Sequence, residues 1–196
     1  GFNVALFHAI NNIHFGFLDS FMLLGTALGD HGNFPLYLAL LVLTAFVAVA
    51  RMPVQDAASQ HTQALRWLAA VAVFSVAYVV DGWVISALKP MLDFPRPPLA
   101  LPEGTVTVVG LAEYHHSLPS GHASFAMLVV ASLWPLFKRW WRVAAALFAL
   151  WVGVSRISLG AHFPADVLAG FLLSLTVVTL VFVAVKNLGR LLHRMN

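Results

Sequence analysis

The chain has 196 residues, of which 60% are hydrophobic and only 10% are charged, with a formal net charge of +3. Soluble domains carry about 25% charged residues, so this composition argues against an ordinary water-soluble domain and predicts an all-α, polytopic bundle of membrane-spanning helices. The sequence contains no cysteine, which excludes disulfides, thiolate metal ligands and cysteine nucleophiles.

Residues 1–33 mix apolar side chains with His, Asn and Asp. This pattern predicts one or two helices that lie in the membrane interface rather than a spanning helix. Because residue 1 is Gly and not Met, we expect that further sequence precedes it, including a sixth spanning helix that returns the N-terminus to the cytoplasm.

Five apolar stretches approach the length of a membrane span, which predicts five spanning helices in this chain. They cover residues 34–50, 65–88, 122–137, 143–159 and 164–185. The third and fourth are short for a hydrocarbon layer about 30 Å thick, so we expect their ends to lie beneath the membrane surface. The whole chain, 1–196, is interpreted as one membrane-embedded domain, with an extracytoplasmic loop over residues 89–121.

The basic residues predict the orientation of the bundle. Eight of the 11 Lys and Arg residues fall in connections or ends that lie on one side of the membrane, together with a single acid, Asp56. These eight are Arg51, Arg66, Lys138, Arg139, Arg142, Lys186, Arg190 and Arg194. By the positive-inside rule this side is cytoplasmic, so the sequence predicts a multi-pass protein of the plasma (inner) membrane.

Three bases, Lys89, Arg96 and Arg156, fall on the opposite, extracytoplasmic side. One such base near a helix end is more often a residue that snorkels or pairs with an acid. Three of them on the side that the positive-inside rule disfavours indicate a phosphate site, in which Arg donates forked hydrogen bonds and Lys supplies a point charge.

Two predicted helix starts face the same side as these bases. Ser120 fits an N-cap, which leaves the amide of Gly121 free, and Pro164 fits the first turn of the last helix. Both helix N-termini are expected to point into the outer cavity and to favour an anion.

The histidines differ in their surroundings. His162 is followed by Asp166 four residues later, a spacing that lets the carboxylate orient the ring as in a Ser-His-Asp triad and makes His162 a candidate nucleophile toward phosphorus. His122, at another helix start, is the candidate proton donor to the leaving oxygen. His115 and His116, with Glu113, are interpreted as rim residues for a head group, and the isolated histidines as interfacial or solvated.

The three segments together match a known pattern. They read Lys89-x6-Arg96-Pro97, then Pro119-Ser120-Gly121-His122, then Ser155-Arg156-x5-His162-x3-Asp166. In order and spacing they resemble the three-part signature of the type 2 phosphatidic acid phosphatase superfamily. The resemblance implies six spanning helices in the membrane branch, an outward-facing site and no required metal.

The resemblance also implies a role for each residue. His162 attacks phosphorus and forms a phosphohistidine, Asp166 orients it, and His122 protonates the leaving group and then activates water. The phosphate oxygens are held by Lys89, Arg96, Arg156, Ser120 and Gly121.

The leading functional hypothesis is therefore a hydrolase of a membrane lipid phosphate or pyrophosphate, acting at the outer membrane face. Undecaprenyl pyrophosphate, phosphatidylglycerol phosphate, phosphatidic acid and the 1-phosphate of lipid A all fit these residues. The alternatives are a lipid-to-lipid phosphotransferase that uses the same site and, with less support, an anion transporter; a soluble vanadium haloperoxidase fits the composition poorly. We expect the lipid bilayer and a lipid phosphate as partners, no nucleic acid, no cofactor and no metal; the oligomeric state stays open.

Overall fold

The computed structural model describes residues 1–53 and 57–195, and every regular element within them is helical. Asp56, which was predicted on the cytoplasmic side, lies outside the described residues. The helices of the described residues are α1 (Phe2–Asn11), α2 (Gly16–Leu28), η1 (His31–Asn33), α3 (Phe34–Ala50), α4 (Ala57–Leu92), α5 (Pro97–Ala100), α6 (Gly121–Leu133), η2 (Trp134–Leu136), α7 (Arg139–Ser158) and α8 (Pro164–Met195).

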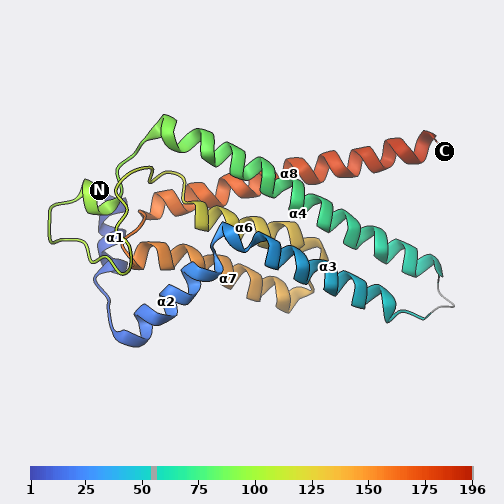
Figure 1. The fold of residues 1–196 in the computed structure, drawn as a ribbon, viewed down its shortest axis with the longest axis horizontal. Helices are drawn as coiled ribbons and strands as arrows, with labels where there is room; N and C mark the ends of the chain where they lie inside the picture. The colour runs from blue at the N-terminus through green and yellow to red at the C-terminus, as the bar shows by residue number, and fades with distance from the viewer. Residues whose placement is uncertain (54–56, 196) are drawn as a thin grey trace.

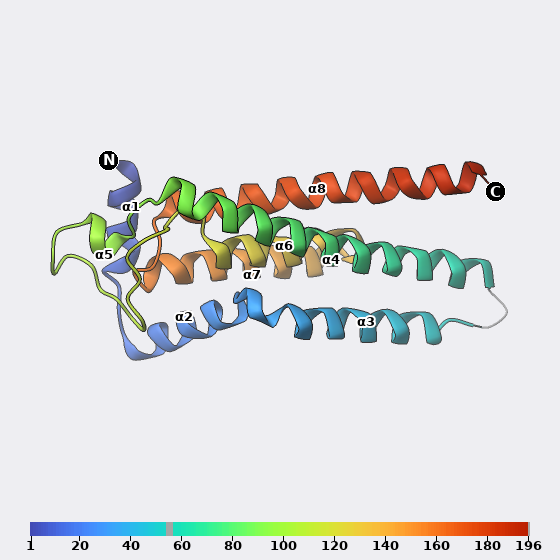
Figure 2. The same cartoon turned by 45° about the horizontal axis from the view of Figure 1, so that its top comes forward.

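Long apolar helices form the body of the molecule, and the short elements gather at one end of it. Figures 1 and 2 show α3, α4, α6, α7 and α8 lengthwise, with α1, α5 and the loop before α6 at one end. Helices suit a lipid environment because each backbone amide and carbonyl bonds within its own segment. The last turn of α3, the start of α4 and the last turns of α8 lie at the opposite end of the bundle.

Among the described residues, four helical segments are long and apolar enough to cross a membrane: His31–Ala50, Ala57–Ala100, Arg139–Ser158 and Pro164–Leu191. They contain the first, second, fourth and fifth predicted stretches. The third stretch corresponds to the shorter apolar segment Gly121–Leu136, in which a 13-residue α-helix is followed by a 3-10 turn. The presence of helices at all five places is confirmed, whereas the count of five spans stays a prediction.

The loop predicted from residue 89 begins later than expected. Helix α4 continues through Pro90 to Leu92, so Lys89 lies in its last turn. The expectation of non-helical backbone from residue 89 onward was therefore wrong at its start. Pro90 removes the amide that would bond to the carbonyl four residues back, and the helix ends two residues after it. Asp93, with φ of 35°, then ends the helix.

Helix α6 is the centre of the bundle and packs mainly against α8, with further contacts to α4 and α7. One apolar cluster joins α4, α6 and α8 through Phe74, Phe125, Leu128 and Val177, all of which are buried. A second, smaller cluster lies nearer the end where the loops gather and contains Phe7 of α1. The end of the bundle is thus tied to its body by apolar burial, the dominant favourable term in folding.

The first turn of α6 lies directly against α8 at Gly170. A Cβ atom on Gly170 would stand 2.5 Å from the carbonyl oxygen of Ser120 and 3.1 Å from the amide nitrogen of Ser124. Small residues at a helix crossing let the two backbones approach in this way. Because Ser120 caps α6 and Gly170 is on α8, this contact sets the distance between the starts of the two helices.

We expect Gly170→Ala to destabilise the protein by about 1–3 kcal/mol, the usual cost of overpacking, because the added methyl group meets backbone atoms that cannot rotate away. Gly189→Ala in the same helix is the matched control, since a Cβ there has nothing within 4 Å. The control should be neutral or slightly stabilising, as alanine has the higher helix propensity. Thermal unfolding in detergent measures both variants, and equal melting temperatures would contradict the packing argument.

Candidate active site

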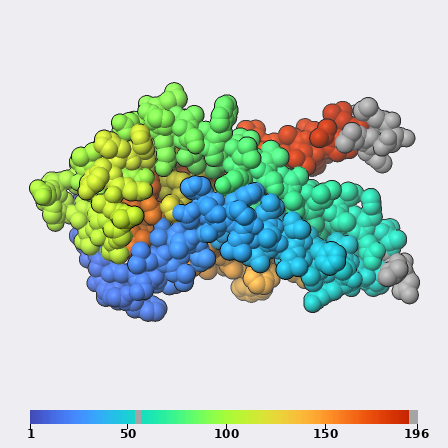
Figure 3. All heavy atoms as spheres, viewed as in Figure 1, coloured from blue at the N-terminus to red at the C-terminus, as the bar shows by residue number. Residues whose placement is uncertain are grey.

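The polar residues singled out in the sequence converge at one end of the bundle. They come from the end of α4, the loop before α6, the first turn of α6, the end of α7 and the start of α8. Figure 3 shows a hollow at this end, where atoms coloured as the start of α6 and the end of α7 are visible between the loop, α4 and the segment joining α2 to α3.

His162 is buried with its two ring nitrogens facing different groups. Its side chain is 1% exposed, its Nε2 lies 3.2 Å from Nη1 of Arg96, and its Nδ1 lies 3.6 Å from Oδ2 of Asp166. An arginine only donates hydrogen bonds, so this contact assigns the lone pair to Nε2 and the proton to Nδ1. The lone pair therefore points toward the cationic side of the site.

Asp166 is held from two directions. Its Oδ2 accepts hydrogen bonds from the hydroxyl of Ser117 at 2.5 Å and from the amide of Phe163 at 2.9 Å. Both donors stabilise the ionised carboxylate and fix it beside His162. Ser117 was not predicted as a site residue, because a serine in a polar loop has no sequence pattern that marks it before the fold is known.

Arg96 is clamped by backbone carbonyl groups. It is 5% exposed, and its Nε donates to the carbonyl of His115 at 2.8 Å while its Nη1 donates to the carbonyl of Ala161 at 3.2 Å. Its own amide donates to the carbonyl of Tyr114 at 2.8 Å. These bonds orient the guanidinium group toward His162.

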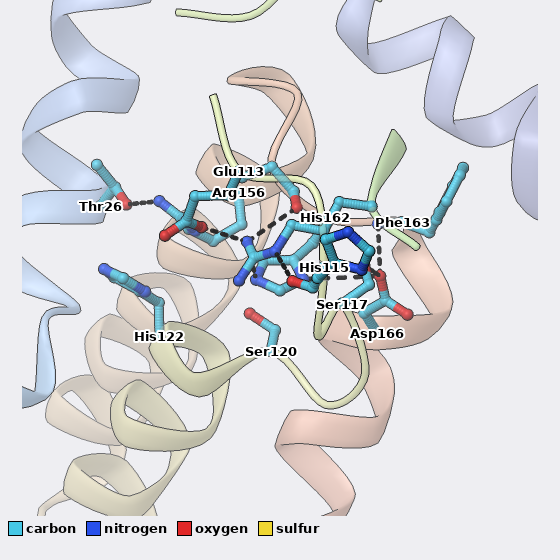
Figure 4. A network of polar contacts seen from close by, with 12 residues as sticks. Thr26, Glu113, His115, Ser117, Ser120, His122, Arg156, His162, Phe163 and Asp166 are labelled. Carbon is cyan, nitrogen blue, oxygen red and sulfur yellow. Dashed lines mark hydrogen bonds and ion pairs between the residues drawn. The ribbon is translucent and has the colours of Figure 1, made fainter. Parts of the chain in front are cut away.

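The other two bases reach the same place from different helices. Nη1 of Arg156 donates to the hydroxyl of Thr26 at 2.7 Å. Lys89 Nζ lies 4.0 Å from the position that a Cβ on Gly121 would occupy. The structure thus brings Lys89, Arg96 and Arg156 together around the start of α6. Figure 4 shows Arg156 and His162 near Ser120, the N-cap of that helix.

The two helix starts differ in the backbone donors that they offer. Ser120 is the N-cap of α6, with its hydroxyl 3.4 Å from the amide of Ala123. At α8 the donors are already used, since the amide of Phe163 bonds to Asp166 and that of Ala165 donates to the side chain of Asn3 at 3.0 Å. The expectation that the N-terminus of α8 also favours an external anion stays a prediction, and the Phe163 and Ala165 amides already have partners within the chain.

The predicted rim residues divide into two groups. The carboxylate of Glu113 forms ion pairs with Arg96 and with Arg156, the latter at 3.6 Å, and so lies among the cations rather than at the rim. His115 and His116 are exposed and face Asp93, with Nδ1 to Oδ1 distances of 3.5 and 3.1 Å. Glu113 thus provides an internal anion where the sequence predicts a phosphate.

Burial governs the protonation of His162. Loss of solvent, assisted by the positive charges of Arg96 and Arg156, lowers the pKa of His162 to about 3, although the contact with Asp166 opposes the shift. The imidazole is therefore neutral at pH 7, and its unprotonated Nε2 accepts the hydrogen bond from Arg96.

His122 has a carboxylate neighbour that the sequence analysis missed. Its Nε2 lies 3.6 Å from Oδ2 of Asp30, in the segment between α2 and η1. In Figure 4, His122 and Asp166 stand on opposite sides of Ser120. The sequence marked Asp30 only as a polar interruption, and its 92-residue separation from His122 gives no local signal. Within residues 1–53 and 57–195, no group of three or more His, Asp or Glu side chains is arranged to hold a metal ion.

Comparison with known proteins identifies similar sequences. The family model of the PAP2 superfamily matches residues 68–190. The lipid A 1-phosphatase of Rhizobium johnstonii is 30% identical over 151 residues, which are 75% of this chain and 61% of that protein. The undecaprenyl-diphosphatase of Sulfolobus acidocaldarius is 28% identical over 177 residues, covering 88% of this chain and 73% of that protein. The chain thus spans less than two thirds of the length of the rhizobial relative.

Solved structures share the fold. The crystal structure of Aquifex aeolicus LpxE superposes with a TM-score of 0.72 at 25% identity, covering 92% of this chain and 94% of that one. The phosphatidylglycerolphosphate phosphatase from Bacillus subtilis superposes with a TM-score of 0.67 at 24% identity, covering 96% and 84%.

We expect Glu113→Gln to bind inorganic phosphate about fivefold more tightly, because a half-exposed carboxylate that competes for the arginines is worth about 1 kcal/mol. Titration calorimetry in detergent measures the affinity. Glu103→Gln is the matched control, since Glu103 lies on the same loop and is exposed. Unchanged or weaker phosphate binding by Glu113→Gln alone would contradict the competition.

The lowered pKa of His162 predicts how stability depends on pH. Between pH 6.5 and about 3 the unfolded chain binds a proton at this histidine that the native protein does not. Its contribution to stability is therefore complete above pH 6.5 and falls with decreasing pH by up to about 1.4 kcal/mol per pH unit.

The test is denaturant unfolding of the wild type and His162→Gln at pH 7 and pH 5. The loss of stability between the two pH values should be smaller in the variant by about 2 kcal/mol. Equal losses in both proteins would show that His162 is not buried in its neutral form.

Proposed function

Because the chain belongs to the PAP2 superfamily, we propose that it is a membrane lipid phosphatase, which hydrolyses the phosphate ester or diphosphate of a membrane lipid through a phosphohistidine. One observation carries this proposal. Nε2 of the neutral His162 imidazole lies 3.2 Å from Nη1 of the buried Arg96, and Asp166 lies beside Nδ1 on the other side of the ring. A nucleophile, its orienting acid and an anion-binding group are thus aligned.

The nucleophilic step follows from this alignment. A phosphate bound by Arg96 places its phosphorus next to the Nε2 lone pair of His162. As the bond between nitrogen and phosphorus forms, the imidazole acquires positive charge, which Asp166 stabilises through Nδ1. Ser117 keeps Asp166 ionised and in position by its short hydrogen bond.

The cations supply the electrostatic part of catalysis. Lys89, Arg96 and Arg156 surround the place where negative charge builds on the phosphoryl oxygens, and the first amides of α6 add donors beside Ser120. Binding of the phosphate displaces Glu113, which pairs with the same two arginines. The exchange replaces one anion by another, so the buried arginines stay compensated throughout.

His122 completes the cycle on the leaving-group side. It donates a proton to the departing oxygen and then, as a base, removes a proton from the water that cleaves the phosphohistidine. The group of residues requires no metal for any of these steps.

The substrate is a lipid, because a polar site at the end of an apolar bundle is reached most directly by a head group whose tails remain in the bilayer. The names of the rhizobial and archaeal relatives make the lipid A 1-phosphate and undecaprenyl pyrophosphate the first two substrates to compare. Phosphatidylglycerol phosphate follows from the Bacillus structure, and phosphatidic acid from the sequence resemblance. We place the site on the periplasmic face of the inner membrane, since the basic connections lie at the opposite end of the bundle.

His162→Ala should lower phosphate release by at least about 10³-fold, because the covalent route is lost. The assay measures free phosphate from each candidate lipid in detergent or liposomes. His61→Ala is the control for a histidine outside the site, because His61 is exposed near the start of α4, whereas Lys89 of the site lies near the end of that helix. Retained hydrolysis in His162→Ala would contradict the mechanism.

Labelled lipid distinguishes hydrolysis from transfer to a second lipid. Under the proposal the label appears as free phosphate, and label on an acceptor lipid would identify a phosphotransferase that uses the same site.

Activity should survive a chelator and be inhibited by vanadate, which imitates the pentacoordinate phosphorus. Complete loss of activity in the chelator would point to a metal-dependent reaction.

A further inference from the structure

We infer that Asp30 is a positioning residue for His122, so that the leaving-group side of the site contains a second histidine–carboxylate pair. The inference rests on the proposed function, because it assigns a partner to the proton donor of that reaction. It concerns a residue outside the segment 68–190 that the family model matches.

The geometry places the Asp30 carboxylate at His122 in a defined orientation. Its Oδ2 lies 3.6 Å from Nε2 of His122, and its Oδ1 accepts a hydrogen bond from the amide of Gly32 at 2.7 Å. The His122 side chain is only 24% exposed. One carboxylate oxygen thus fixes the turn, and the other faces the imidazole.

The turn that carries Asp30 is itself seated on two other helices. A Cβ on Gly29 would stand 2.3 Å from Cγ1 of Val152, which shows how closely this turn approaches α7. On the other side, the hydroxyl of Tyr78 on α4 donates to the carbonyl of His31 at 3.3 Å. Asp30 is therefore held by tertiary contacts rather than placed on a freely moving loop.

The same segment reaches the site a second time. Thr26, one helical turn before Asp30, accepts the hydrogen bond from Arg156. Thr26 on α2 thus contacts a phosphate-binding base, and Asp30 just after α2 contacts the proton donor. This segment therefore borders the site on one side.

The charges around His122 give Asp30 its chemical role. The charged and titratable groups that face the imidazole are Asp30 and His31 from the turn, Arg156 from α7 and Lys89 from α4. Burial is the main influence that disfavours a protonated His122 imidazole, the positive charges of Arg156 and Lys89 add to it, and Asp30 is the acid among these groups that opposes it. The carboxylate therefore helps His122 to hold the proton that the leaving group requires.

The proposed reaction has two steps, formation and hydrolysis of the phosphohistidine. In the first, the bond from phosphorus to the leaving oxygen breaks, that oxygen takes the proton of His122, and His162 forms the new bond to phosphorus. In the second, the oxygen of water forms a bond to phosphorus while the bond from phosphorus to Nε2 of His162 breaks, His122 takes a proton from the water, and inorganic phosphate leaves. Asp30 stays ionised in both steps and alternately faces an imidazolium and an imidazole.

Asp30→Asn removes the charge and keeps the turn, because an asparagine oxygen can still accept from the Gly32 amide. The variant is assayed with phosphatidic acid, whose alcohol leaving group needs a proton, and with 4-nitrophenyl phosphate, whose leaving group does not. We expect kcat to fall about tenfold or more for the lipid and less than about twofold for the aryl phosphate, with little change in KM for either.

The pH dependence of kcat/KM tests the inference, because a purely structural role of Asp30 would not change it. Without the carboxylate, His122 loses its proton more readily, so the alkaline limb of kcat/KM for the lipid should move about one unit to lower pH. Asp30→Glu should restore the wild-type limb in part. The matched control is Asp19→Asn, because Asp19 pairs with His14 at 2.8 Å elsewhere in the N-terminal segment; its profile should match that of the wild type.

Two outcomes overturn the inference while the proposed function stands. The first is unchanged lipid hydrolysis in Asp30→Asn, and the second is an equal loss for both substrates with an unmoved alkaline limb. If instead the wild type releases no phosphate from any lipid while His162→Ala behaves identically, the proposed function itself fails.

Discussion

The close approach of α6 to α8 is the contact on which the rest of the site depends. Gly170 leaves space for the carbonyl of Ser120, and the amide of Ser120 donates to the carbonyl of Asp166 at 3.0 Å. The N-cap of one helix is therefore bonded to the first turn of the other. This single crossing brings His122 and His162 to one end of the bundle, although 40 residues separate them in the sequence. A side chain at position 170 would meet the carbonyl of Ser120 and the amide of Ser124 directly.

A second constraint is the burial of positive charge at the end of an apolar bundle. Removing a guanidinium group from water is costly unless an anion compensates it. Arg96 and Arg156 obtain this compensation from Glu113, which lies on the loop before α6. The site can therefore be assembled before the substrate arrives, and the phosphate takes over an arrangement that already suits an anion. Preorganisation of this kind lowers the reorganisation needed when charge develops on the phosphoryl oxygens.

The N-terminal segment has a larger part in the structure than an interfacial anchor would require. Asn11 is fully buried, and its side chain donates to the carbonyl groups of Thr107 and Ser158 at 2.8 Å while accepting from the amide of Thr107 at 2.9 Å. It thereby joins the long loop to the end of α7. Thr26 on α2 contacts Arg156, and Asp30 after α2 contacts His122. Residues 1–33 are therefore part of the scaffold around the candidate site. Their polar residues, which argue against a spanning helix, are the ones that the fold uses for these contacts.

Composition and local spacing were sufficient for the helical membrane bundle, the N-cap at Ser120 and the pairing of His162 with Asp166. Each of these depends on neighbours within one helix or one turn, where backbone geometry dictates which side chains meet. The position of Glu113 between two arginines, the hydrogen bond from Ser117 and the place of Asp30 beside His122 were decided only by tertiary structure. These contacts join residues 17 to 92 positions apart. Their distances follow from how the helices and the loop before α6 pack, which no local pattern encodes.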